Sequence, residues 1–237
     1  MLLAIVTLLA LAHALAAAAK NDAPIPTIDP ATCPEIKVDP AHVLDYRIRD
    51  SSAWMKFQYE DNWNNHTSPA VEHISAGEYS HRVMADLNFT LSRWTNHVVA
   101  LEALIQYTVA GGKSYEFPPA ECYFASAHRW DPDDISPYLL EGQFYFAVHQ
   151  YERAAQSYQQ ALKIDDGSAD AHYNLGLVYL QLQNYDAALS HAQAAYLAGY
   201  PLPGLRKRLQ DLGKWREPVK RTADNSNAAP AATSAQH

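Results

Sequence analysis

The chain of 237 residues lacks the motifs that carry common enzymatic chemistry. It contains no Gly-rich phosphate loop, no Gly-x-Ser-x-Gly, no His-Glu-x-x-His and no Cys-x-x-Cys. Its paired carboxylates, Asp133 with Asp134 and Asp165 with Asp166, lie in expected turns, where Asp commonly caps a helix. Because no acid, base and nucleophile that converge can be named, we predict no catalytic residues and keep an enzyme as the weakest functional hypothesis.

Metal-binding patterns are also missing. The chain has two cysteines, too few and too far apart for a zinc-ribbon site. Its 11 histidines are scattered, and His149, His172 and His191 would meet only if neighbouring helices stacked them. Histidines on helices more often serve the surface or the core than a metal, so we predict no metal and no cofactor.

An excess of basic charge is absent as well. Lys and Arg number 18 against 26 Asp and Glu, which gives a formal charge of −8. Nucleic-acid binding requires a basic footprint, so the sequence argues against a nucleic-acid partner. Residues 201–221 alone carry a net +5, and the rest of the chain carries −13. This basic end either meets an anionic membrane or an acidic partner, or is simply a solvated helix face.

One long apolar run is present, Met1 to Ala19, which ends in four alanines before Lys20. This run predicts a secretory signal peptide, and hence a periplasmic or secreted protein. An uncleaved anchor is the alternative, because no Lys or Arg precedes the run, although His13 and the alanines make a poor span. Elsewhere no stretch is apolar enough to cross a membrane, and no cysteine follows the alanines to accept a lipid.

The two cysteines, Cys33 and Cys122, are expected to pair, because an even number in an oxidising compartment indicates a disulfide. The bond would tie a Pro- and Asp-rich arm to the helical part of the chain. Closing a loop of about 90 residues stabilises a fold by about 4–5 kcal/mol in the chain-entropy model. The alternative is one buried cysteine and one exposed thiol.

A repeat of 34 residues is the strongest pattern in the chain. Such a period indicates a helix–turn–helix unit that buries its apolar face against neighbouring units. Glycine lets helices approach closely, alanines seven residues apart share one face of each second helix, and tyrosines fill the space between units. The matched positions are Gly142, Tyr145, Tyr151, Ala154, Tyr158 and Ala161, with Gly176, Tyr179, Tyr185, Ala188, Ala192 and Ala195.

Residues 169–176 (Ala-Asp-Ala-His-Tyr-Asn-Leu-Gly) and 184–188 (Asn-Tyr-Asp-Ala-Ala) closely resemble a tetratricopeptide repeat (TPR). The preceding unit begins near Ile135 and departs from the family pattern at Glu141, where Leu is usual. The resemblance implies an all-α fold, a right-handed helix–turn–helix solenoid. The wider stretch 65–215 resembles exported bacterial TPR proteins, a resemblance that brings no assigned chemistry.

The rest of the chain is organised around these units. We expect an extended N-terminal arm and an irregular, partly helical segment over 20–64, then TPR-like repeats over 65–200, clearest at 135–168 and 169–201. A helix at about 97–110 and another from Ala120 should form an earlier pair. Residues 222–237, rich in Ala, Asn, Ser and Pro, should be disordered.

A capping helix is expected within 201–221. Leu205, Leu209, Leu212 and Trp215 follow one another at helical spacing and would form one apolar stripe. A solenoid needs such a helix, apolar on one side and polar on the other, to cover its last unit.

Protein binding is the function that this organisation favours. The first helix of each TPR lines a concave surface, which here is largely apolar and carries only Asn174 as a residue of the carboxylate-clamping type. We therefore predict a groove for a helix or an extended peptide of a protein partner, unless the arm at 20–64 fills it. The resemblance assigns the groove to Leu101, Ile105, Leu139, Gln143, Phe146, Tyr173, Asn174, Leu177 and Leu180.

The sequence thus predicts an exported protein-binding module, scaffold or assembly factor. A self-associating structural subunit of an extracellular assembly is the alternative, because the ends of solenoids stack readily. The oligomeric state distinguishes the two. Asn65 and Asn88 also fit the N-glycosylation pattern.

Overall fold

The computed structural model describes residues 27–36 and 44–217, and within these ranges all regular structure is helical. This confirms the all-α fold class. The expected signal peptide and the C-terminal tail lie outside the described residues, and none of the described helices is long and apolar enough to span a bilayer. The α-helices are α2 (Ala53–Asn62), α3 (Ser68–Ser75), α4 (His81–Arg93), α5 (Val98–Val109), α6 (Ala120–Trp130), α7 (Ile135–Ala147), α8 (Tyr151–Ile164), α9 (Ala169–Gln181), α10 (Tyr185–Leu197) and α11 (Gly204–Asp211).

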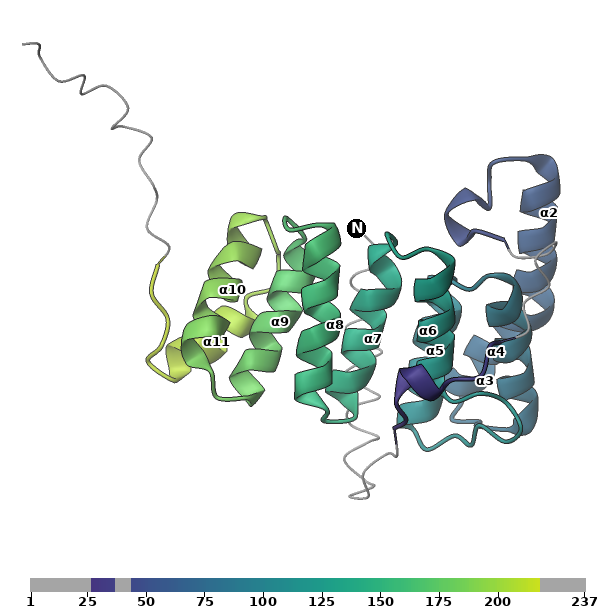
Figure 1. Ribbon diagram of the computed structural model, residues 1–237, viewed down its shortest axis with the longest axis horizontal. Coiled ribbons are helices and arrows are strands. Elements are labelled where there is room, and N and C mark those ends of the chain that lie inside the picture. Colours follow the sequence, from purple (N-terminus) through teal and green to yellow (C-terminus); the bar gives the residue numbers. More distant parts are fainter. Residues whose placement is uncertain (1–26, 37–43, 218–237) are drawn as a thin grey trace, which may run out of the picture.

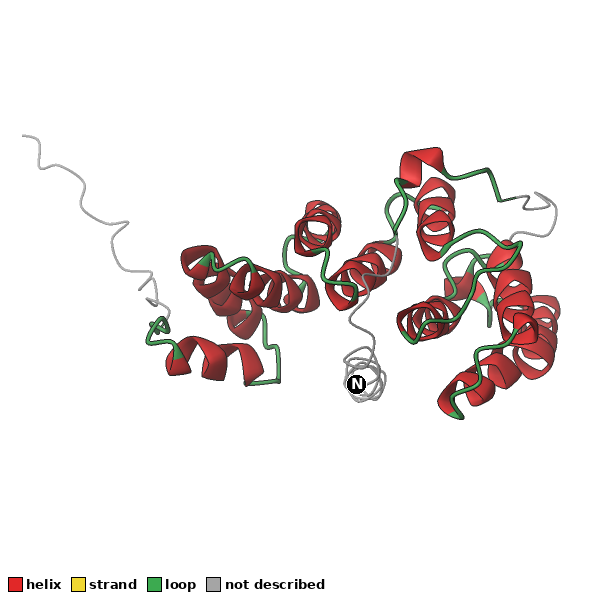
Figure 2. Cartoon of the chain, turned by 90° about the horizontal axis from the view of Figure 1, so that it is seen from below, coloured by secondary structure: helices red, strands yellow, loops and turns green. Residues whose placement is uncertain are grey.

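The helices follow one another along the long axis of the molecule, from α2 at one end to α11 at the other (Figure 1), and Figure 2, seen from below, shows that they lie on more than one level. The closest packing joins α7 with α8 and α9 with α10. These two hairpins begin at Ile135 and Ala169, so the period of the sequence is the period of the structure. The arrangement is that of a helical solenoid.

Polar caps fix where the repeat helices begin. The carboxylate of Asp134 accepts a hydrogen bond from the Ser136 N–H at 2.9 Å and starts α7. The hydroxyl of Ser168 accepts from the N–H of Ala171 at 3.3 Å at the start of α9. Each side chain satisfies a backbone donor that has no partner within its helix, and thereby stabilises that end.

The repeated glycines sit where a side chain would collide with a packed neighbour. A Cβ at Gly142 would lie 2.6 Å from the ring of Tyr158, and one at Gly176 would lie 2.6 Å from the Leu205 side chain. The alanines at the repeat positions are buried between helices, Ala154 and Ala188 among them. Small residues at these positions therefore allow the close packing on which the fold depends.

Earlier helices continue the row. Helices α5 and α6 form the pair expected before the two clear repeats, and α3 and α4 form a further one. Between α4 and α5, the side chain of Asn96 accepts a hydrogen bond from the N–H of Tyr46 at 3.0 Å and donates to Asp45 and Asp134. Residues 44–48 are thereby attached to the corner between these helices.

The described part of the arm, residues 27–36, contains only the short 3-10 turn η1 (Pro30–Thr32). Ile36 of this segment is buried in the main core. Cys33 lies against α6, with its Cα 5.2 Å from that of Cys122, which is the separation of disulfide-bonded residues. The structure thus brings together the two cysteines that were expected to pair.

The cap α11 is shorter than its apolar stripe predicted. Leu205 and Leu209 are buried against the last repeat, but the helix ends at Asp211 and Leu212 is exposed. Gly213 has φ +67°, and the N–H of Lys214 donates back to the carbonyl of Leu209. A left-handed glycine closed by such a bond terminates a helix, so Trp215 returns to the core from a turn rather than from the helix.

Candidate functional site

The residues predicted to line the concave groove differ in exposure. Leu101 and Ile105 of α5 are 0% and 2% exposed and belong to the main core, and Tyr173 of α9 is also buried. The remaining residues lie on α7 and α9, consecutive first helices that contact each other. The half-buried ones are Leu139, Gln143, Phe146, Asn174, Leu177 and Leu180.

Packing explains the buried members. Helix α5 is surrounded, because it contacts α3, α4, α6 and α7. The ring of Tyr173 stacks on that of Tyr200 with centroids 3.9 Å apart and meets Tyr196 edge-on. In this structure Leu101 and Ile105 therefore offer no surface to a partner, and Tyr173 offers little.

The described arm lies against second helices. The N–H of Ile28 donates to Glu121 of α6 at 2.8 Å, and the carbonyl of Ile28 accepts from Arg153 of α8 at 2.9 Å. The hydroxyl of Thr27 accepts from Gln150, next to α8. Figure 1 shows this purple segment in front of α6. These contacts are with α6 and α8, and not with the predicted groove residues of α7 and α9.

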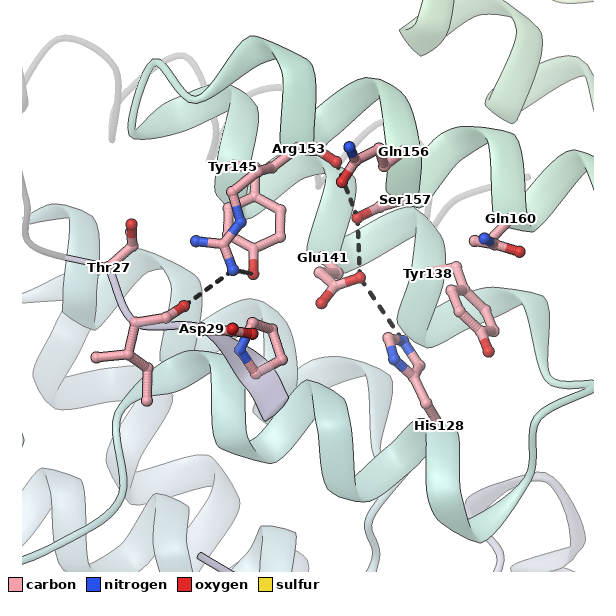
Figure 3. Close-up of a pocket in the computed structure, with 12 residues that line it drawn as sticks. Thr27, Asp29, His128, Tyr138, Glu141, Tyr145, Arg153, Gln156, Ser157 and Gln160 are labelled. Atoms are coloured by element: carbon pink, nitrogen blue, oxygen red, sulfur yellow. Dashed lines mark hydrogen bonds and ion pairs between the residues drawn. The ribbon is translucent and has the colours of Figure 1, made fainter. Parts of the chain in front are cut away.

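A polar pocket opens where the arm meets α6, α7 and α8. Its volume is about 770 Å³, and Figure 3 shows Glu141 between Ser157 and His128, with Gln160 and Thr27 farther out. Residues 27–30 form one wall. The helices supply His128 from α6, then Tyr138, Glu141 and Tyr145 from α7, then Arg153, Gln156, Ser157 and Gln160 from α8.

Glu141 is the central residue of the pocket. It is 7% exposed and stands at the repeat position that Leu175 occupies in the next unit. Burial raises the pKa of its carboxyl to about 7, although the hydroxyl of Ser157, which donates to Oε2 at 2.8 Å, favours the ionised form. A carboxyl with this pKa exchanges its proton near neutral pH.

His128 faces Glu141 from α6. Its ring stacks on that of Tyr138, with centroids 3.9 Å apart and an interplanar angle of 6°. Burial lowers the pKa of the imidazole to about 4, so the ring is neutral at pH 7. Nε2 lies 3.9 Å from Oε2 of Glu141 and has no hydrogen-bond partner among the described residues.

Arg153 lies at the edge of the pocket and holds neighbouring groups in place. Its guanidinium carbon lies 4.1 Å from the centre of the Tyr145 ring. Its N–H groups donate to the hydroxyl of Tyr145 at 2.6 Å, to Gln150 at 3.1 Å and to the carbonyl of Ile28 at 2.9 Å. The guanidinium thus holds the arm to α7 and α8.

The order of these groups differs from that of a hydrolytic triad. Ser157 donates to Glu141, and Glu141 faces His128, whereas a catalytic serine contacts the histidine that deprotonates it. What the pocket offers is therefore a recess with a carboxyl, an imidazole and aromatic rings, which suits binding better than nucleophilic attack.

The sequence carried one signal for this pocket. Glu141 replaces the leucine usual at its repeat position. A carboxyl at a position that is normally apolar and buried indicates a polar site. The sequence did not predict that His128, Arg153 and the arm line the same pocket, because only the folded chain brings residues 27–30 to α8.

The other sequence candidates do not converge. His172 and His191 meet, with their Nδ1 atoms 2.9 Å apart, but His149 bonds to Tyr151 instead. No group of three metal-binding side chains is found within residues 27–36 and 44–217. Asn65 is exposed, whereas Asn88 lies in α4 and accepts a hydrogen bond from Tyr123 at 2.7 Å.

Comparison with known families identifies the repeat. Residues 142–183, from the middle of α7 through α8 to the end of α9, match the family model described as TPR repeat. With the helix pairs and the packed Gly and Ala positions, this match supports tetratricopeptide repeats in this part of the chain. Such repeats are protein–protein interaction or scaffold modules.

Proposed function

We propose that this tetratricopeptide repeat protein is an exported binding module or scaffold that takes up a helix or an extended segment of a protein partner along α7 and α9. One observation carries the proposal. The apolar side chains of Leu139, Phe146, Leu177 and Leu180 remain only half-buried on consecutive first helices. A partner that covered them would bury further apolar surface, which stabilises a complex.

Export is supported by two independent features. The apolar run at residues 1–19 has the composition of a signal peptide. Cys33 and Cys122, 89 residues apart in sequence, lie at disulfide separation, as expected in an oxidising compartment. We therefore propose a disulfide-bonded protein of the periplasm or the extracellular space.

A site-specific cross-linking experiment tests the groove. A photo-crosslinking residue at Leu177 should capture a partner in an envelope extract, whereas the same residue at Leu197 should not. Leu197 is the matched control, because it is 72% exposed and lies on α10, a second helix.

A charge in the groove completes this test. Leu177→Glu should abolish capture through a crosslinker at Phe146 while the helical circular dichroism stays unchanged, and Leu197→Glu should leave capture intact. Equal capture at both crosslinker positions, or capture that survives Leu177→Glu, would contradict the groove.

Self-association is the second candidate. Leu212 is exposed near the C-terminal end of the row, where a second copy could pack. Light scattering after size exclusion distinguishes the candidates, because a monomer supports the binding module and a concentration-dependent polymer supports the structural subunit. An enzyme stays the weakest hypothesis, since this fold is typically non-catalytic.

A further inference from the structure

The pocket between the arm and α6–α8 holds a buried acceptor that no donor among the described residues satisfies. Nε2 of His128 is buried without a partner among the described residues, while the ring interacts with the backbone of Pro137. It faces Oε2 of Glu141 across 3.9 Å. A neutral imidazole that holds its proton toward Pro137 presents a lone pair at Nε2, so two acceptors face each other. Oε2 already accepts from Ser157, so Nε2 of His128 is the acceptor that still lacks a donor, and a donor placed between the two atoms would serve both.

The charges around the gap favour a cation over an anion. Glu141 and Asp29 contribute carboxyls to the pocket lining, and the charge of Glu121 also acts on Glu141. Among the described residues, Arg153 is the cation that lines the pocket, and it already donates to Tyr145, Gln150 and the Ile28 carbonyl. An anion would therefore find no free charged donor, whereas a cation would find a buried carboxylate.

The geometry suits an ammonium group. A nitrogen that donates to two acceptors about 2.8 Å away can bridge atoms 3.9 Å apart, and an ammonium carries three donors. The ring of Tyr138 stacks on the His128 ring and lines the same pocket. A cavity of about 770 Å³ also has room for the alkyl chain that carries the nitrogen.

We propose that this pocket binds a primary alkylammonium group, with the carboxylate of Glu141 and Nε2 of His128 as its acceptors. The site is separate from the half-buried faces of α7 and α9, so this proposal can be tested independently of the proposed groove. Two sources share this chemistry, the lysine side chain of a partner protein and a free alkylamine.

Direct titration of the oxidised protein tests the proposal. The probes are Nα-acetyl-lysine methylamide, its norleucine counterpart without the nitrogen, and n-pentylamine, with the His128 ring resonance followed by NMR. The lysine probe should bind saturably and at least about tenfold more tightly than the norleucine probe, since a buried charge-assisted hydrogen bond is at stake. Tighter binding of the lysine probe than of n-pentylamine identifies a peptide source, and the reverse identifies a free amine.

Three variants separate recognition from folding. Glu141→Gln keeps the shape of the side chain and should lower the affinity for the lysine probe by at least about tenfold. Glu141→Leu introduces the residue that the next repeat uses and should abolish binding while the protein stays folded. The matched control is Glu152→Gln, which removes an exposed carboxyl on α8 outside the pocket and should leave affinity unchanged.

Affinity should also rise between pH 6 and pH 8. The pKa of Glu141 is about 7, so its carboxylate forms over this interval, while His128, with a pKa of about 4, stays neutral. The charged or titratable groups that face Glu141 are His128 and Glu121 of α6, Tyr138 and Tyr145 of α7, Arg153 of α8 and Asp29 of the arm.

Several results would overturn the proposal. They are equal binding of the lysine and norleucine probes, undiminished binding by Glu141→Gln, an affinity that does not change with pH, and no saturable binding of any amine. The last would mean that water alone fills the gap between His128 and Glu141.

Discussion

Replacing Glu141 with leucine should stabilise the protein, and the gain should depend on pH. The carboxyl is 7% exposed at a position where the next repeat buries Leu175 completely. Leucine has a similar size and removes the need to bury a polar group. Its one direct cost is the hydrogen bond from Ser157, whose single hydroxyl proton can turn instead to the carbonyl of Arg153, 3.2 Å away.

The magnitude follows from the pKa. Burial raises the pKa of Glu141 from 4.5 to about 7. Between these values the native protein keeps the proton that the unfolded chain has released, so stability falls as pH rises. The accumulated loss is about 3 kcal/mol above pH 7 and vanishes below pH 4.5. Glu141→Leu should therefore gain about 2–3 kcal/mol at pH 8, or about 5–10 °C in melting temperature, and much less at pH 5.

Thermal and urea unfolding at pH 5 and pH 8, followed by circular dichroism at constant ionic strength, measure this difference. Burial also raises the pKa of Glu102 to about 7, so only the comparison of variant with wild type isolates Glu141. The control Glu152→Leu, at an exposed position on α8, should change stability little at either pH. A gain that is equal at both pH values, or absent at pH 8, would refute the assignment of a raised pKa to Glu141.

Three further predictions concern the fold. Ala188→Leu should lower stability by about 1–3 kcal/mol in urea unfolding, because Ala188 is fully buried between helices, and an unchanged midpoint would contradict that packing. Mass spectrometry of the alkylated native protein should detect no free thiol at Cys33 or Cys122, and reduction should lower the melting temperature; two free thiols in protein from an oxidising compartment would reject the bond. The pKa of His191 is lowered to about 4 by burial and by His172, so stability should fall as pH drops from 6.5 toward 4, and His191→Gln should weaken that dependence in an acid titration of the melting temperature.

The surface exposure of the residues assigned to the groove was predictable only in part. A repeat pattern assigns helix faces by position within the unit, and for α7 and α9 this placed Leu139, Phe146 and Leu177 on half-buried surfaces. For α5 the same assignment placed Leu101 and Ile105 in the groove, but α3 and α4 pack against that helix and bury both residues. The degenerate early repeats gave no pattern from which this packing could be read.

By itself the sequence determined the repeat architecture. Gly142, Gly176 and the buried alanines are local requirements of close helix packing, so they recur at a fixed spacing and can be recognised without coordinates. Only the tertiary structure decided the polar pocket, since its walls come from residues 27–30 and from α6, α7 and α8. Contacts between segments so far apart leave no periodic trace, because their geometry depends on how every intervening helix packs.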